Sequence, residues 1–169
     1  MKKFLCVVCA ILMLSGCGLE KSKEEKNEIP DFTGFSADVY TEINDIKVSG
    51  SAEYTELDGL VLTLTSPETL AGMEIICKDS ECRVNLHELS FSVLYENLPP
   101  NSLPTSLMAC AENAKTSIYE NGCYKLSANG YTYQLYLDET TYNFQKLMLD
   151  GYTILVFENF QYIMGQTDK

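Results

Sequence analysis

The sequence contains no tryptophan, one histidine and few basic residues, and these absences narrow the functions open to it. Twelve Lys and Arg stand against 24 Asp and Glu, so the formal net charge is −12 at pH 7. Such an acidic chain repels phosphates, which argues against a nucleic-acid partner. It also repels anionic lipid headgroups, so a basic patch is not how this protein would reach a membrane. Apolar residues still make up 46% of the chain, an ordinary share for a globular protein.

Residue patterns for catalysis and metal binding are also scarce. His87, the one histidine, stands at the end of an expected strand, and no Gly-x-Ser-x-Gly segment accompanies it. Nucleophilic catalysis needs a base that a third group orients, so a satisfied or solvent-exposed histidine is the better interpretation. The acidic residues fall in no calcium-loop spacing, and sequence alone singles out no pair of catalytic acids. We therefore expect no enzyme activity, no catalytic residue, no cofactor and no bound metal.

The N-terminal residues carry the strongest functional signal. Lys2 and Lys3 precede an apolar run over residues 4–14, which ends in Leu14-Ser15-Gly16-Cys17. A basic start, a short apolar run and small residues at the end are typical of a secretory signal. The run is too short to span a hydrocarbon core of ~30 Å, which takes about 20 apolar residues. Its ending resembles the lipobox of bacterial lipoproteins, in which the cysteine thiol receives a diacylglycerol and a peptidase cleaves just before it.

The lipobox resemblance implies a signal peptide over residues 1–16 and a mature chain of 153 residues that begins with lipidated Cys17. Residues 18–30 are mostly Lys, Glu, Ser and Asn, a composition that cannot bury a core, so we expect a flexible tether over 17–30. A single domain over 31–165 and a tail over 166–169 complete the chain. We expect this domain to be lipid-anchored on the extracytoplasmic face of the cell membrane.

From residue 32 onward, apolar and polar residues alternate with a period of two. The pattern holds over 35–40, 46–54, 60–64, 73–77, 82–86 and 89–93. Alternation of this kind is typical of antiparallel strands with one buried and one wet face. Asp58-Gly59 between two of these segments indicates a hairpin turn. The first half of the domain is therefore predicted to be a meander of antiparallel strands.

The period changes only between Ser102 and Asn121. Pro104 suits the first turn of a helix, and Gly122 suits the position just past its end. Strands are expected again over 123–128, 131–138, 141–149 and 152–158, with Asn129-Gly130 and Asp150-Gly151 as hairpin turns. The apolar residues at helical spacing are Leu103, Leu107, Cys110, Ala111, Ala114 and Ile118.

Taken together, this order of elements resembles the lipoprotein-carrier superfamily (LolA/LolB-like), including its relatives among lipoproteins of Gram-positive bacteria. The resemblance covers about residues 32–162 and includes Val48-Ser49-Gly50, Ser66-Pro67-Glu68 and a closing Val156-Phe157-Glu158-Asn159-Phe160. It implies a mainly β (α+β) fold, in which a single strongly curved antiparallel sheet forms an unclosed half-barrel. One main helix would cover the concave face, where members of the superfamily hold lipid or acyl chains.

The one-sided apolar pattern and the resemblance together predict a lipid, acyl or other hydrophobic ligand in the concave face. The same residues can instead form a dry core. The alternative is then a ligand-free structural or protein-interaction module with a protein partner in the cell envelope. The candidates for lining the ligand site are Val39, Ile46, Val48, Leu62, Leu64, Ile75, Val84, Phe91 and Leu135.

Four cysteines, Cys77, Cys82, Cys110 and Cys123, lie in the expected domain. An even number in an exported chain suggests disulfides, with three ways of pairing. Cys77 and Cys82 flank a four-residue turn in phase with the inward residues, which favours a bond between them. A bond between Cys110 and Cys123 would pin the helix to the sheet. Free buried thiols and a four-thiolate zinc site are the other interpretations, although spacings of four and twelve residues suit zinc poorly.

The tyrosines are concentrated after the expected helix. Aromatic ladders can stack on sugar rings, which suggests a cell-wall-binding surface, but cross-strand pairing within the sheet is the favoured interpretation. The residues concerned are Tyr124, Tyr131, Tyr133, Tyr136, Tyr142 and Tyr152.

Overall fold

A computed structural model describes residues 29–43 and 45–164 of the protein. The expected signal peptide, Cys17, most of the tether and the tail over 166–169 lie outside the described residues. Within the described part of the chain, no helix is both long enough and apolar enough to cross a membrane.

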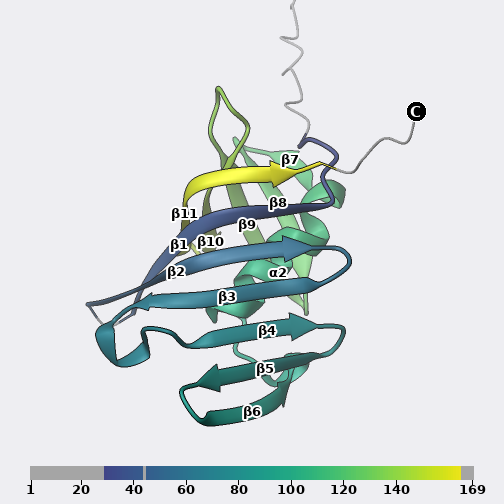
Figure 1. The fold of residues 1–169 in the computed structure, drawn as a ribbon. Helices are drawn as coiled ribbons and strands as arrows, with labels where there is room; N and C mark the ends of the chain where they lie inside the picture. Colours follow the sequence, from purple (N-terminus) through teal and green to yellow (C-terminus); the bar gives the residue numbers. More distant parts are fainter. Residues whose placement is uncertain (1–28, 44, 165–169) are drawn as a thin grey trace, which may run out of the picture.

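Eleven antiparallel strands form one sheet, in the spatial order β6-β5-β4-β3-β2-β1-β11-β10-β9-β8-β7 (Figure 1). The expected fold class is confirmed: a mainly β domain with an unclosed, curved sheet and one main helix. The strands are β1 (Gly34–Ile43), β2 (Ile46–Thr55), β3 (Gly59–Ser66), β4 (Glu74–Lys78), β5 (Glu81–Leu86), β6 (Leu89–Leu94), β7 (Ile118–Glu120), β8 (Cys123–Ala128), β9 (Tyr131–Leu137), β10 (Phe144–Leu149) and β11 (Tyr152–Ile163).

The first and last strands, β1 and β11, are neighbours in the middle of the sheet, so the two meanders grow outward from there. Their free edges are β6 and β7, and the chain between these edges carries the helix α2 (Leu103–Asn113). The sheet curls around α2, with β7–β10 behind the front strands (Figure 1). Two further short 3-10 turns, η1 (Glu68–Leu70) and η2 (Tyr95–Asn97), precede the helix.

Hairpin turns appear where the sequence predicts them. Asn129-Gly130 and Asp150-Gly151 both adopt left-handed backbone angles, with φ of 51° and 80° in the first turn and 51° and 82° in the second. These angles match the right-handed twist of the flanking strands, and Asn, Asp and Gly tolerate them best.

The predicted helix is too long at its C-terminal end. It ends at Asn113, tightens into the 3-10 turn η3 (Ala114–Thr116) and gives way to strand β7. Ile118 continues the helical spacing of apolar residues, but Asn121-Gly122 is a hairpin turn with φ of 55° and 79°. That turn pairs β7 with β8, so sheet pairing overrides the helical pattern in this segment.

We call residues 95–116, which run from η2 through α2 to η3, the lid. Its helix packs against β8, β3, β1 and β11, and residues 103–111 are all buried. Ser102 caps the helix by accepting a hydrogen bond from the Thr105 N–H. At the other end, Lys115 Nζ lies 3.1 Å from an Asp31 carboxylate oxygen and 3.0 Å from one of Glu56. The helix therefore fills the groove of the half-barrel, and the ion pairs of Lys115 fasten the C-terminal end of the lid.

Next to the lid, an aromatic cluster joins the first and last strands of the described domain. Phe144 on β10 lies with its ring centroid 4.5 Å from Phe160 and 5.6 Å from Phe157, both on β11. Phe35 on β1 stacks on Phe160 at 5.4 Å. Such pairs add roughly 0.5–1.5 kcal/mol beyond the area they bury, so this cluster stabilises the β1–β11 junction.

Candidate functional site: the uncovered part of the concave face

The strand register places apolar side chains of the first six strands in rows across the concave face. Directly paired residues in antiparallel strands point to the same side of a sheet. One row crosses six strands in succession, from the buried centre to the β6 edge. Its members are Ala37, Ala52, Leu62, Ile75, Val84 and Phe91.

Burial falls steadily along this row. Leu62 beneath the lid is 0% exposed, Ile75 and Val84 are half-buried, and Phe91 is 60% exposed. The lid covers the centre of the concave face; Cys77 and Cys82 are buried as well, so the uncovered part lies toward the other end of β4–β6. We call the uncovered apolar part of this face the open strip. Its residues are Ile46, Val48, Met73, Ile75, Val84, Leu86, Leu89 and Phe91.

Four of the nine predicted lining residues are closed off in the core. Val39, Leu62, Leu64 and Leu135 lie on the predicted face, but none is more than 4% exposed. The lid packs over this part of the sheet and takes the space that a ligand would need. For these four residues, the dry core that the sequence left open is what the structure contains.

The other five predicted lining residues, Ile46, Val48, Ile75, Val84 and Phe91, belong to the open strip. Its most exposed members are Leu89, Phe91 and Ile46, at 69%, 60% and 54%. Met73, Leu86 and Leu89 were not among the predicted lining residues. The alternation of β4, β5 and β6 places them on the same face, and that signal is present in the sequence.

Tyr133 on β9 holds the lid to the sheet, and Tyr95 adds a bond within the lid itself. The Tyr133 hydroxyl donates to the Pro100 carbonyl oxygen at 2.9 Å, and the Tyr95 hydroxyl donates to that of Thr105 at 3.4 Å. Burial is the main cause that raises the pKa of Tyr133 to about 12 and also raises the pKa of Tyr95. Both hydroxyls therefore stay protonated as donors at neutral pH, so the Tyr133 bond between β9 and the lid is kept.

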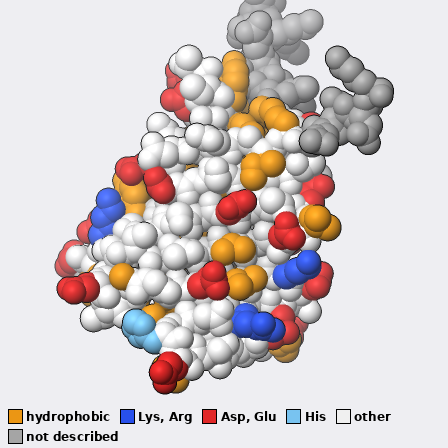
Figure 2. Space-filling view, viewed as in Figure 1, with side chains coloured by type: hydrophobic (Ala, Val, Ile, Leu, Met, Phe, Trp, Pro, Cys, Tyr) orange, Lys and Arg blue, Asp and Glu red, His pale blue; other side chains and the backbone are white. Residues whose placement is uncertain are grey.

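The opposite, convex face of the sheet is predominantly polar (Figure 2). Ser51, Thr63 and Arg83 point to this side from β2, β3 and β5, in alternation with the concave residues. Ile76 is a half-buried apolar residue on this face, next along β4 from Ile75. Exposed apolar residues of these strands are therefore concentrated on the concave face, in the open strip.

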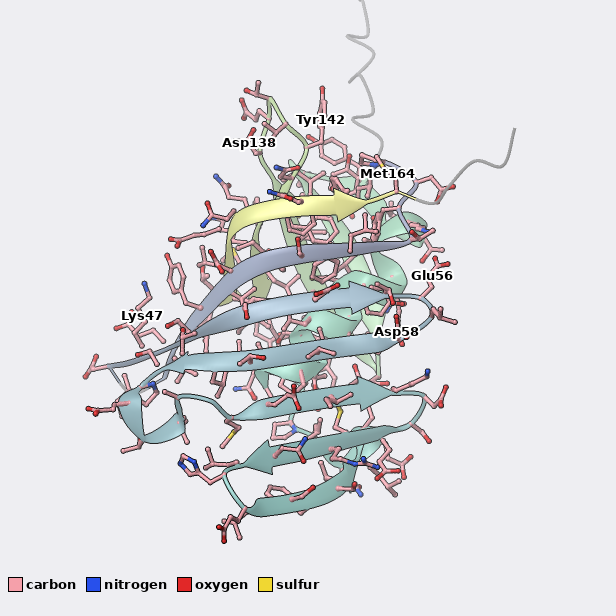
Figure 3. All side chains as sticks on the ribbon, in the orientation of Figure 1. Lys47, Glu56, Asp58, Asp138, Tyr142 and Met164 are labelled. Atoms are coloured by element: carbon pink, nitrogen blue, oxygen red, sulfur yellow. A yellow bond between two sulfur atoms is a disulfide. The ribbon has the colours of Figure 1, made fainter. Side chains whose placement is uncertain are left out.

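The front strands end on two opposite sides of the molecule, and different residues mark each side (Figure 3). Glu56 and Asp58 mark one end, where the ion pair from Lys115 fastens the lid. Lys47 marks the opposite end, and the neighbouring Ile46 is exposed there.

Of the two predicted disulfides, the structure contains one. Cys77 and Cys82 are paired directly across β4 and β5 and form a disulfide within the hairpin. The predicted bond between Cys110 and Cys123 is wrong, because both cysteines are free and buried.

The alternation of β8 explains why Cys123 does not reach the helix. Tyr124 and Leu126 belong to the same core cluster as Cys110, so they point toward the lid. Cys123 is the neighbour of Tyr124 in the strand and points to the other side of the sheet. There its thiol donates to the Glu120 carbonyl oxygen at a distance of 3.4 Å.

His87 lies in the turn between β5 and β6, exposed and with a left-handed φ of 52°. It therefore serves the turn geometry of this hairpin. Within the described residues, no three His, Cys, Asp or Glu side chains gather closely enough to hold a metal ion.

The tyrosines after the helix do not form one ladder. Tyr124 and Tyr133 are buried in the core, whereas Tyr131 and Tyr152 are exposed by 43% and 77%. Tyr124 pairs across β7 and β8 with Tyr119, with ring centroids 5.1 Å apart. This is the cross-strand pairing that the sequence favours.

A cleft of about 460 Å³ lies at the end of β7–β9, between Tyr119, Tyr136 and the loop after β9. Asp138 organises this loop, because one carboxylate oxygen accepts hydrogen bonds from the N–H groups of Thr140 and Thr141 and from the Thr141 hydroxyl. These bonds lower the pKa of Asp138. The acidic side chains here serve the loop, and the open strip remains the candidate site.

No known protein family matches the chain, and no curated protein matches it. Among solved structures, the chain is similar to an uncharacterized conserved protein from Thermus thermophilus. The two share 13% sequence identity with a TM-score of 0.47, over 79% of this chain and 81% of that one. We draw no conclusion about function from a likeness at this level.

Proposed function

We propose that the protein is a lipoprotein, anchored through Cys17 on the extracytoplasmic face of the membrane, that binds a lipid, acyl chain or other hydrophobic ligand on the open strip. The observation that carries the proposal is the row from Leu62 to Phe91, which continues the apolar core out to solvent. The lipobox and the resemblance to the lipoprotein-carrier superfamily support the same function. We propose a binding role without catalysis.

The energetics favour an apolar ligand at this place. Fully burying a side chain such as Leu89 or Phe91 contributes about 1.5–3 kcal/mol, and both are now largely exposed. Neighbouring strands lie about 4.8 Å apart, so the strip from β2 to β6 extends over roughly 19 Å. A ligand along the strip would have the edge of the lid as one wall and the sheet as its floor.

The neighbours Ile75 and Ile76 provide a matched test. They are the same residue type on the same strand, both half-buried, and they point to opposite faces. We expect Ile75→Glu to abolish binding of a fluorescent fatty acid, because it places a carboxylate in the strip. Ile76→Glu should bind like the parent protein. Cys17→Ser serves as the parent in all three samples, so no detergent competes for the probe.

Organic extraction of the purified full-length protein, followed by mass spectrometry, provides a second measurement. Lipids beyond those of the anchor should co-purify with the protein and be lost in Ile75→Glu. If no lipid co-purifies and the parent takes up no fatty acid, the ligand proposal is wrong.

The second candidate function is a ligand-free module that presents a protein-binding surface on the cell envelope. It is favoured by the filled interior, since Val39, Leu62, Leu64 and Leu135 leave no room beneath the lid. In this case the open strip would be covered by an envelope protein. A photo-crosslinking residue at Phe91 in growing cells should then capture that protein, while the fatty acid fails to bind.

A further inference from the structure

The two edges of the sheet are protected very differently. Strand β7 is three residues long and carries Glu120, and both shortness and charge keep an edge strand from pairing with other chains. Strand β6 has six residues, Leu-Ser-Phe-Ser-Val-Leu, with neither a charge nor a proline. Five of its six residues are exposed, and only Val93 is half-buried. Of the two edges, β6 is the one suited to accept another strand.

Backbone chemistry specifies what kind of partner fits β6. It pairs with β5 on one side only, and the order of the sheet places no strand on its other side. Its outward N–H and C=O groups form a row that another extended strand satisfies with main-chain hydrogen bonds. On the concave side, Leu89 and Phe91 also remain largely exposed. A second strand would satisfy these backbone groups and place its own apolar side chains beside Leu89 and Phe91 on the concave face.

The order of side chains in β6 identifies that strand. Read outward from Phe91, the pattern is the same in both directions: Ser90 and Ser92 come first, then Leu89 and Val93. An antiparallel pair of identical strands centred on Phe91 therefore places apolar residues opposite apolar residues and serine opposite serine. We propose that β6 is a self-association edge, at which a second copy of this chain adds its own β6 and joins the two sheets.

The Phe91-centred register determines which residues of the two copies lie opposite each other. Phe91 lies opposite the second copy's Phe91, and Leu89 lies opposite the second copy's Val93. The concave faces of both copies then point to the same side, so the two open strips become continuous. Leu94, three residues from the axis, is separated from the second copy's Leu94 by about 20 Å at 3.4 Å per residue.

The charge distribution is compatible with this pairing. Two copies with a formal net charge of −12 repel each other, so a contact between them needs a surface without carboxylates. In the Phe91-centred register, Glu88 lies opposite the second copy's Leu94, so no two carboxylates are directly opposed. An isologous interface of this kind closes as a dimer and leaves the β7 edges apart.

Disulfide trapping in membranes of cells that express the full-length protein tests the register. Phe91→Cys places a thiol directly opposite its counterpart, so mild oxidation should give a dimer band on a non-reducing gel. Leu94→Cys is the matched control: it lies in the same strand, its side chain is 49% exposed, and it has no opposing thiol within reach. Trapping of Leu94→Cys as strongly as Phe91→Cys overturns the register. A cross-linked band at the mass of this chain plus another protein would show that the partner of β6 is not a second copy.

The mass of the detergent-solubilised full-length protein provides an independent measurement. The unsubstituted protein should have the mass of a dimer, and Ser92→Lys should have that of a monomer, because a lysine on the edge strand opposes pairing. Ser51→Lys places the same charge on the exposed convex face of β2 and should remain a dimer. A monomeric unsubstituted protein, or a dimer that Ser92→Lys leaves intact, contradicts the proposal. Neither outcome depends on whether the open strip binds a ligand.

Discussion

Cys110 is a single residue whose surroundings determine its chemistry. Its side chain is 0% exposed in the core, and burial raises the pKa of its thiol. A thiol kept protonated and out of contact with solvent is a poor nucleophile. We therefore expect Cys110 to resist alkylation in the folded protein at neutral pH. Cys123, which is also buried and donates to a backbone carbonyl, should behave in the same way.

Peptide mapping after differential alkylation measures this. Cys110 and Cys123 should be alkylated after denaturation without reductant, whereas Cys77 and Cys82 should need reduction first. Recovery of a peptide cross-linked between Cys110 and Cys123 would contradict the arrangement of β8 described above.

The lowered pKa of Asp138, in the loop after β9, predicts that its contribution to the free energy of unfolding depends on pH. Its pKa is lowered below the ordinary value of 3.8, because the N–H groups and hydroxyl around it bind the ionised carboxylate. A group with a lowered folded-state pKa stabilises the fold above its unfolded pKa and loses that contribution as the pH falls through its folded pKa. Asp138→Asn keeps the acceptor oxygen and removes the charge. We expect the substitution to lower the free energy of unfolding at pH 7.

The loss should shrink as the pH falls below 3.8 and end below the lowered folded-state pKa of Asp138, where both proteins are neutral at this position. Urea unfolding of the two proteins at a series of pH values gives this difference directly. A difference that stays constant down to the acid limit would show that the carboxylate does not act through its charge. Glu139→Gln, a neighbouring exposed carboxylate in the same loop, is the control and should show no comparable trend.

At the scale of the elements, the same Leu→Ala substitution should lower the free energy of unfolding much more in the helix than in the open strip. Leu107 on α2 is 0% exposed, and Leu89 on β6 is 69% exposed. Leu107→Ala leaves a cavity between lid and sheet and should cost about 2–5 kcal/mol of the free energy of unfolding. In a Ser92→Lys background, which keeps β6 unpaired, Leu89→Ala removes the same atoms from an exposed position and should change it by no more than about 0.5 kcal/mol. Chemical denaturation followed by circular dichroism measures both.

If Leu89→Ala proved as destabilising as Leu107→Ala, the strip would be packed in the folded protein and could not receive a ligand. In that case a segment of the protein itself would already cover β6.

Most strands are predictable from the sequence, because one face of the sheet is buried and the other is wet. The register of β4 with β5, for example, follows from apolar residues in phase on either side of a short turn. Strand β7 is not predictable in the same way, because Ile118 also fits the helical spacing that precedes it. Only the pairing with β8, a contact outside the helical window, determines which structure forms.

The sequence predicts which residues point to the concave face, but it does not predict which of them remain exposed to solvent. Val39 and Phe91 carry the same signal in the sequence, an apolar residue at an inward position of a strand. The first is buried and the second is exposed, because the lid reaches one and not the other. The path of the lid depends on contacts such as that between Tyr133 and Pro100, which are 33 residues apart in the sequence. Alternation within a strand contains no information about such contacts.

At the scale of the whole molecule, the described domain starts and ends at the same side of the sheet. The Thr33 N–H donates to the carbonyl oxygen of Ile163 at 2.8 Å, so the incoming and outgoing segments are joined by a backbone hydrogen bond. Both meanders extend from this junction, and the lid connects their outer edges. The start of β1 therefore lies in the middle of the sheet, five strands away from the β6 edge.

The last prediction concerns that anchor. The domain is acidic, and within its described residues no helix is long and apolar enough to span a membrane. Under the proposed function, attachment then depends on acyl chains at Cys17, and two chains hold stably where a single one is marginal. Cys17→Ser should therefore stop lipid transfer and leave the protein either unprocessed, at the mass of the full chain, or released into the aqueous phase of a phase-separation assay, in both cases without the diacylglyceryl group. Cys123→Ser changes a cysteine of the folded domain instead and should remain in the detergent phase with the normal mature mass. A Cys17→Ser protein that still partitions into detergent at that mass would show that something other than Cys17 attaches the protein to the membrane.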